Sequence, residues 1–368
     1  MSLLPRVSVG DTGISVSQLA LGGFHQLEVS SEIVQQTVDT FLEAGGNYIE
    51  TARGYGNGAS EQKLAQAIKD RRDQIVLASK SSQWTATGIR GDLESSLRTL
   101  NTDHINFYFL HNIETDEMLQ QVMANDGALA TLVNVKEQGL IDGIGMSSHR
   151  PWMYKKAIDR GMPLSLILIW HNYLDALNFP QIKSEIFPLA KANNITITAM
   201  KPLGDGLLYQ SVENAIRYAL GTGPDVLVSG MNSPEQVRQV AAAIAKGPAD
   251  PDLIDQIMKD SPELGNYVCR QCGECPDTLM ELFQLEGYAD RQMTDFYPHS
   301  PADFSMRCRL GGWFGLGQIG KQKFAEKNWN ITKLADAASR IQCPYQIDIP
   351  RKLRIATAKL SDGNQEYL

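Results

Sequence analysis

The sequence is poor in several features that would place a protein in a special class. It has five cysteines and none precedes Cys269, which excludes a disulfide framework spanning the chain. No apolar run approaches the roughly 18 residues of a transmembrane helix. Residues 1–6 lack the charged and apolar regions of a signal peptide. These absences predict a cytoplasmic protein that does not enter a membrane.

Positive charge is also scarce. The chain holds 34 Lys and Arg against 42 Asp and Glu, a net charge of −8, without a Lys/Arg block. Because phosphates repel an acidic surface, neither nucleic acid nor anionic lipid is expected as a partner. With 43% hydrophobic and 21% charged residues, the composition is that of an ordinary globular protein rather than a disordered one.

Short apolar, β-branched runs recur along the first two thirds of the chain. They cover residues 18–24, 47–51, 74–80, 105–111, 140–147, 164–172, 195–201 and 226–231. Their starts are about 25 to 35 residues apart, the length of one strand–helix unit. Eight such units favour an α/β fold, a closed (β/α)8 TIM barrel. An open doubly wound sheet is the alternative, but its glycine fingerprint is absent from the first strand–helix turn, residues 22–26.

Helical periodicity fills the gaps between several of these runs. Apolar residues recur at helical spacing over 31–44, 60–68, 91–100, 119–138 and 234–245. Before the first run, residues 7–16 hold two alternating segments around a Gly/Asp turn. This pattern predicts a β-hairpin that closes the bottom of the barrel.

The pattern changes after about residue 250. All cysteines follow, strand-like runs stop, and Gly and aromatic residues are dense from 296 to 329. We therefore expect two domains, a barrel over residues 1–260 and a small, mainly helical appendage over 261–368.

Ionisable side chains end otherwise apolar strands of the predicted barrel. Glu50, Lys80 and His111 end the second, third and fourth runs, and Tyr55 follows Glu50 within Gly54-Tyr55-Gly56. Strand carboxyl ends meet at one mouth of a barrel, so these groups should converge there. A nearby ammonium favours a phenolate and should lower the pKa of Tyr55. This set suits protonation of a carbonyl oxygen while a cofactor delivers hydride.

Several segments, in order, resemble the aldo-keto reductase family. They are residues 47–56 with Ser60-Glu61, Leu77-Ala78-Ser79-Lys80, residues 103–111, 143–148, 201–204 and 229–235. The resemblance spans about residues 5 to 245 and implies a (β/α)8 barrel with a nicotinamide cofactor. It makes Tyr55 the general acid/base, Lys80 and Glu50 its tuning pair, and His111 the group that orients the substrate.

The same resemblance implies a set of residues for NADP or NAD. They are Ser147, Ser148, Asn172, Met200, Lys201, Pro202, Leu203, Gly204, Gly206, Gly230, Met231, Asn232, Ser233 and Gln236. The sequence departs from the family at three positions. Glu50 replaces the usual Asp, Met200 the usual stacking aromatic, and Gln236 and Arg238 stand nearest to the usual basic partner of a 2′-phosphate. The choice between NAD and NADP therefore stays open.

The cysteines form a second motif. Cys269, Cys272 and Cys275 have C-x2-C-x2-C spacing, and Cys343 is followed by proline, the ligand pattern of a ferredoxin cubane. This resembles the aldo-keto reductase subgroup with a C-terminal ferredoxin-like extension and implies one [4Fe-4S] cluster. Cys308 is a rival fourth ligand, and four-thiolate zinc or an unmetallated site are the alternatives.

Two weaker signals remain. Residues 315–320 match G-x-G-x-x-G, but no strand–helix–strand unit surrounds them, so a helix turn is favoured over a dinucleotide site. His25, His149 and His171 are secondary candidates for lining the mouth.

The sequence thus predicts an NAD(P)-dependent oxidoreductase acting on an aldehyde, ketone or sugar-like polyol. Two alternatives stay open. One is an isomerase or lyase that keeps NAD tightly bound, and the other is a redox-sensing or scaffold protein that uses the barrel to bind a nucleotide. A redox partner protein also stays open.

Overall fold

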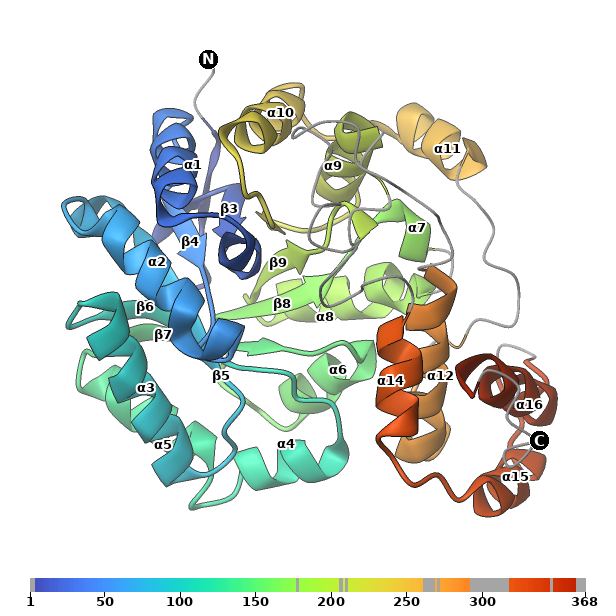
Figure 1. The fold of residues 1–368 in the computed structure, drawn as a ribbon. Helices are drawn as coiled ribbons and strands as arrows, with labels where there is room; N and C mark the ends of the chain where they lie inside the picture. Colours follow the sequence, from blue (N-terminus) through green and yellow to red (C-terminus); the bar gives the residue numbers. More distant parts are fainter. Residues whose placement is uncertain are drawn as a thin grey trace. The chain divides into compact units, whose positions relative to one another are not determined.

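Eight parallel strands close into a barrel in the computed structural model, and helices surround them (Figure 1). The (β/α)8 prediction is confirmed, and each strand falls within its predicted run except β5, which extends one residue further, to Ser81. In order around the barrel the strands are β3 (Leu19–Gly22), β4 (Tyr48–Glu50), β5 (Val76–Ser81), β6 (Ile105–Leu110), β7 (Ile141–Ser147), β8 (Leu166–Trp170), β9 (Thr196–Met200) and β10 (Val226–Ser229), and β10 pairs with β3.

The structure describes residues 4–176, 179–204, 208, 211–260, 269, 272–291, 318–344 and 347–361. Of these, residues 4–176 and 181–260 form one compact unit. The residues from 269 onward, with 179 and 180, belong to a second. The predicted boundary between residues 260 and 261 adjoins a stretch, 261–268, outside the described residues, and stays a prediction.

Helices and short turns connect the strands of the first unit. They are η1 (Phe24–Glu28), α1 (Ser31–Glu43), η2 (Tyr55–Gly58), α2 (Ala59–Ile68), η3 (Arg72–Gln74), α3 (Ala86–Leu100), α4 (Asp116–Val122), α5 (Ala128–Glu137), α6 (Pro151–Asp159), α7 (Tyr173–Ala176), η4 (Ile182–Ile186), α8 (Phe187–Ala192), α9 (Val212–Gly221), α10 (Pro234–Ala245) and α11 (Pro251–Asp260). None of the helices described here is both long and apolar enough to cross a membrane.

One predicted helix is wrong. The run 119–138 is two helices, α4 and α5, because the chain turns through residues 123–127 between them. Gly127 is needed there, since a Cβ on it would lie 2.3 Å from the carbonyl oxygen of Val122. The helix predicted to begin at residue 91 begins at Ala86, where the Thr85 side chain accepts a hydrogen bond from the Gly88 amide.

Aromatic side chains explain two glycines inside the barrel. Phe107 and Phe109 pair in register with Gly143 and Gly145 on the neighbouring strand. A Cβ on Gly145 would lie 2.4 Å from the Phe109 ring. Because protein interiors are close-packed, these bulky rings require small residues beside them.

The N-terminal hairpin closes the lower end of the barrel, as predicted. Strand β1 (Arg6–Ser8) pairs antiparallel with β2 (Ser15–Ser17). Val9 and Val16 are fully buried and join the cluster of inward-facing apolar side chains. The Gly10 amide donates to Thr196 Oγ1 at the start of β9, so the opposite end is left for the functional groups.

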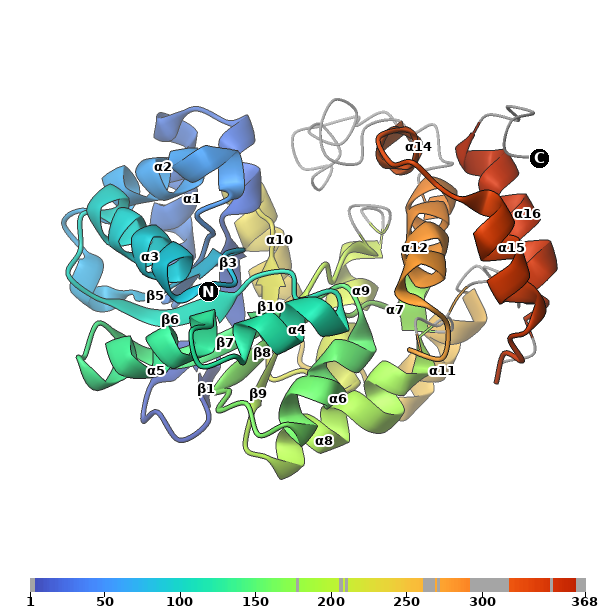
Figure 2. The ribbon, with the colours of Figure 1, turned by 90° about the horizontal axis from the view of Figure 1, so that it is seen from below.

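The described part of the second unit is helical, as predicted. It contains α12 (Asp277–Arg291), α14 (Gln318–Ala325), α15 (Ile331–Ser339) and α16 (Ile349–Leu360), coloured orange to red in Figure 2. These helices pack on one another around an apolar cluster that includes Phe283, Phe324 and Leu353. Of the G-x-G-x-x-G motif, residues 315–317 lie outside the described part, and the rest falls in α14. The ferredoxin-like character stays a prediction.

Candidate active site

The lysine at the end of β5 joins three groups. Lys80 Nζ contacts the Glu50 carboxylate, donates to the Thr51 carbonyl oxygen at 2.7 Å, and donates to the Tyr55 hydroxyl at 3.1 Å. Strands β4 and β5 are neighbours in the barrel, which brings the two charges together. The longer Glu50 side chain therefore still reaches the lysine. Lys80 is 0% exposed, and the Glu50 carboxylate is its charged partner in place of solvent.

The turn after β4 aims the phenol. Gly56, Asn57 and Gly58 all have positive φ, 58°, 52° and 92°, a conformation that favours glycine. A Cβ on Gly58 would lie 1.9 Å from the Arg53 guanidinium. The backbone amide of Tyr55 donates to the Ala52 carbonyl oxygen at 3.0 Å. The glycines on either side of Tyr55 thus allow the backbone to turn sharply, which brings the Tyr55 side chain back to Lys80.

Burial, rather than the neighbouring charge, controls the acidity of Tyr55. Desolvation raises the pKa of the Tyr55 phenol well above its usual value of about 10. The net shift is upward, opposite to the predicted lowering, because desolvation dominates; a charged Lys80 still favours the phenolate over the phenol. Burial also lowers the pKa of Lys80, an effect that the contacting Glu50 carboxylate opposes. At neutral pH the phenol is protonated and able to donate.

His111 lies beside the phenol. Its backbone amide donates to the Ser81 carbonyl oxygen at 2.9 Å, which carries the barrel pairing past the end of β6. Its ring meets the Tyr55 ring edge-on, with centroids 5.8 Å apart. Burial first, and then the charges of Lys80 and His149, lower the pKa of His111 well below 6.5. The imidazole is neutral at physiological pH and can donate or accept one hydrogen bond.

The predicted nucleotide residues follow β7, β8 and β9 in sequence. Ser147 Oγ accepts from the Asn112 amide at 3.1 Å, and Asn172 Nδ2 donates to the Lys201 carbonyl oxygen at 3.2 Å. Lys201 has a positive φ of 58°. Ser148, Pro202, Leu203 and Gly204 are buried, and Met200 ends β9. Gly206 lies outside the described residues.

The β10–α10 turn carries the other predicted nucleotide residues, Gly230, Met231, Asn232, Ser233 and Gln236. Ser233 Oγ caps α10 by accepting from the Gln236 amide, and Gln236 Oε1 accepts from the Asn232 amide at 2.8 Å. Asn232 Oδ1 and Gln236 Nε2 are buried and have no hydrogen-bond partner among the described residues. Two polar atoms at a helix N-terminus are thus left for a bound molecule.

Of the secondary histidine candidates, His171 is a packing residue. It stacks on Tyr218, with ring centroids 5.8 Å apart, meets Phe187 edge-on, and shares a 2.6 Å hydrogen bond with Thr222. His25 pairs with Glu28 at 2.9 Å and packs against Gly230, where a Cβ would lie 2.0 Å from its ring.

Two groups near the site were not predicted from the sequence. One is the Thr51 carbonyl oxygen, a backbone atom that no residue type reveals. The other is Glu114, three residues after His111, which accepts hydrogen bonds from His149. The spacing from His111 was the only signal available for Glu114, because the pairing depends on the neighbouring strand.

The four described cysteines come from two segments that are distant in sequence, and neighbouring thiols raise one another's pKa. All are partly buried, and Cys269, Cys275 and Cys343 pack against the apolar cluster of the second unit. Burial, followed by the charges of the other three thiols, raises the pKa of Cys275 to about 12. Within the described residues, no three Cys, His, Asp or Glu side chains are arranged to hold a metal ion. Cys308 lies outside the described part.

Comparison with known proteins places the first unit. Residues 18–214 match the model of the Aldo/keto reductase family. The chain is 28% identical over 229 residues to norsolorinic acid reductase stcV of Emericella nidulans, and 26% identical over 212 residues to the uncharacterized oxidoreductase YqkF of Bacillus subtilis. These matches cover 55% and 54% of this chain, and only 57% and 65% of the relatives.

A solved structure agrees. The holo form of aldo-keto reductase AKR11C1 from Bacillus halodurans superposes with a TM-score of 0.62 at 24% identity, covering 70% of this chain and 97% of that one. At this identity the likeness shows the fold, the same (β/α)8 barrel. Since the family model matches more than half of its length, the chain belongs to the aldo/keto reductase family.

Proposed function

We propose that the protein is an NAD(P)-dependent oxidoreductase that transfers hydride between the nicotinamide and the carbon of a carbonyl or alcohol. One observation carries this proposal. The Lys80 ammonium donates a 3.1 Å hydrogen bond to the Tyr55 hydroxyl, beside the neutral ring of His111. Tyr55 can therefore donate a proton, and the charged Lys80 lies beside the phenolate that forms when it does.

Each side chain then has a defined task in carbonyl reduction. Tyr55, protonated at neutral pH, gives its proton to the substrate oxygen. The Lys80 ammonium stabilises the phenolate as it forms, and the Glu50 carboxylate keeps that ammonium charged. His111 orients the carbonyl by donating from its one N–H. In alcohol oxidation the same groups act in reverse.

The residues present fit a nicotinamide dinucleotide. Asn232 Oδ1 and Gln236 Nε2 are buried without a partner among the described residues, and the α10 N-terminus next to them suits a phosphate. Ser147 ends β7, Ser148 and Asn172 follow β7 and β8, and Met200 offers a thioether for packing on a ring. NAD or NADP, when bound, supplies or accepts the hydride.

Replacement of Tyr55 tests the proposal. Tyr55→Phe should lower NAD(P)H-dependent reduction of a panel of aldehydes by about 10² to 10⁴-fold and leave nucleotide affinity, measured by fluorescence quenching, nearly intact. Unchanged turnover would overturn the assignment. Turnover without net consumption of NAD(P)H would favour an isomerase or lyase. Tight nucleotide binding without turnover would favour a redox-sensing or scaffold protein.

The second unit is proposed to hold one [4Fe-4S] cluster on Cys269, Cys272, Cys275 and Cys343, which would place the chain in the subgroup with a ferredoxin-like extension. Support comes from the C-x2-C-x2-C spacing and from the packing of Cys269, Cys275 and Cys343 against one apolar cluster, although the described side chains are not arranged around a metal ion. Zinc on the same thiolates is the alternative. The expected result for anaerobically purified protein is about four irons and four sulfides per chain. Stoichiometric zinc would contradict it.

A further inference from the structure

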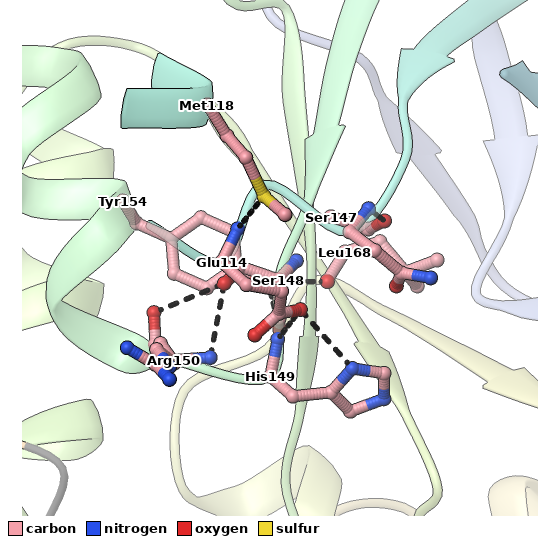
Figure 3. Close-up of polar contacts among 9 residues, drawn as sticks. Glu114, Met118, Ser147, Ser148, His149, Arg150, Tyr154 and Leu168 are labelled. Atoms are coloured by element: carbon pink, nitrogen blue, oxygen red, sulfur yellow. Dashed lines mark hydrogen bonds and ion pairs between the residues drawn. The ribbon is translucent and has the colours of Figure 1, made fainter. Parts of the chain in front are cut away.

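A carboxylate and a histidine meet on two neighbouring turns at the carboxyl ends of the strands. Glu114 lies between β6 and α4, and His149 lies between β7 and α6. Glu114 Oε1 accepts from the His149 backbone amide at 2.8 Å and lies 3.3 Å from Nδ1 of its ring. Figure 3 shows both contacts reaching one carboxylate. Backbone and ring of His149 are therefore held by the same oxygen.

The carboxylate is ionised. Burial acts to raise the pKa of Glu114, but the hydrogen bonds and charge of His149, with the charge of Arg150, outweigh it and lower the pKa. An ionised carboxylate accepts hydrogen bonds only. The His149 ring therefore presents a proton on Nδ1 to this carboxylate, which leaves Nε2 to bond to another group.

The ring lies next to the proposed substrate site. His149 meets Trp170 edge-on, with ring centroids 6.3 Å apart, and Trp170 pairs in register with Met200. On the other side, the charge of His149 acts on His111. The side chains of His149 and Glu114 are 13% and 19% exposed. Among the described residues, His149 Nε2 has no hydrogen-bond partner.

We propose that His149 is a substrate-binding residue whose Nε2 forms a hydrogen bond with a hydroxyl that the substrate carries near its reacting carbonyl, with Glu114 as its positioning residue. This inference rests on the proposed function and names its substrate class, the hydroxylated aldehydes and ketones. A hydroxyl both donates and accepts hydrogen bonds, so Nε2 can bond to it in either protonation state of the ring.

Two aldehydes with the same three-carbon skeleton test the inference. Propanal lacks hydroxyl groups and glyceraldehyde has two. For the full chain with saturating NADH or NADPH, kcat/KM should favour glyceraldehyde by at least about 10-fold, since a site that bonds a substrate hydroxyl discriminates against its absence. His149→Phe should bring the ratio close to one, with the loss concentrated on glyceraldehyde.

Matched variants separate binding from a structural role. His149→Gln, whose amide oxygen can accept a hydrogen bond, should retain part of the preference. Glu114→Gln keeps an oxygen that can accept from the backbone amide and the ring of His149 but removes the negative charge. It should raise KM for glyceraldehyde more than it lowers kcat. Equal losses on both aldehydes, or a lowered Tm that accounts for the loss, would show a structural role and overturn the inference.

Failure of the inference differs from failure of the proposed function. If neither aldehyde is reduced, or if Tyr55→Phe has no effect, the proposed function fails and the inference fails with it. If wild type reduces both aldehydes in a Tyr55-dependent way, without a preference that His149→Phe removes, only the inference is overturned.

Discussion

The two units of the chain each bury a lysine–glutamate pair. In the barrel, Lys80 and Glu50 are 0% and 4% exposed; in the second unit, Lys352 and Glu286 are 3% and 1% exposed. Lys80 also donates to the hydroxyl of Tyr55. Lys352 Nζ instead lies over the Phe283 ring at 4.9 Å, and Glu286 takes a second cation, Lys359, at 3.3 Å.

The difference shows that a buried charge does not by itself indicate chemistry. Burial and charge are alike in the two pairs, but the barrel lysine contacts a hydroxyl that can exchange a proton with a substrate, whereas Lys352 lies over an apolar ring. A buried pair is weak support for stability, since desolvation offsets the attraction, yet loss of one partner is costly. What the pair contacts therefore decides whether its removal affects catalysis or folding.

The largest expected effect follows neutralisation of the barrel pair. The double variant Lys80→Met/Glu50→Gln removes both charges together, so that no buried charge is left alone. Reduction of aldehydes should fall by about 10² to 10⁴-fold, because Tyr55 loses the cation beside its oxygen. Steady-state kinetics measures this, with nucleotide affinity as the control. A loss smaller than about 10-fold would contradict the role of Lys80.

The matched change in the second unit should act on stability instead. Among the described residues, Lys352→Met leaves the partly exposed Lys359 as the one cation beside buried Glu286, and should cost about 3 to 5 kcal/mol in the free energy of unfolding of that unit. Urea unfolding followed by far-UV CD measures the loss. Lys352→Met/Glu286→Gln should recover part of it. If Lys352→Met lowered turnover without lowering stability, the proposed difference between the two pairs would be contradicted.

A smaller effect is expected for His171, a buried group that has no ion-pair partner among the described residues, unlike the two lysine–glutamate pairs. Burial, and then the charge of Lys183, hold the pKa of His171 at about 3, against about 6.5 in an unfolded chain. Below pH 6.5 His171 binds a proton in the unfolded chain but stays neutral in the folded state. The contribution of neutral His171 is therefore present above pH 6.5 and is lost as the pH falls toward 3.

Chemical unfolding at several pH values checks this sign. Between pH 6.5 and 4.5, wild type should lose about 2 kcal/mol more than His171→Gln, which has no titrating ring and can still bond to Thr222. The slope against pH is compared rather than the absolute stability, since the variant also loses ring packing against Tyr218. Parallel slopes would show that His171 titrates normally.

The barrel was predictable because its signal is periodic. Eight apolar runs at even spacing fix the strands, and the residue that ends each run fixes which groups meet, so Glu50, Lys80 and His111 could be identified together. The break between α4 and α5 was missed because the apolar spacing on either side was interpreted as one helix, although Asn125-Asp126-Gly127 is a sequence typical of turns. The close approach of Gly127 to the Val122 carbonyl oxygen explains why glycine is required there.

The acidity of the site was less predictable than its membership. The sign of the Tyr55 shift depends on how completely the phenol is buried, which is a sum over many tertiary contacts. The Glu114–His149 pair depends on adjacent turns and on a backbone amide. Residue types and spacing contain neither kind of information.

The most direct test of the central claim, that Lys80 acts through Tyr55, is a double-mutant cycle on the rate of hydride transfer. Lys80→Met/Glu50→Gln, which leaves no buried charge alone, Tyr55→Phe and the combined variant are compared with wild type in single turnovers with bound NADPH or NADH. Because residues that act as a unit are strongly non-additive, the combined variant should be hardly slower than Tyr55→Phe alone. Additive losses would show that Lys80 and Tyr55 act independently and would contradict the account.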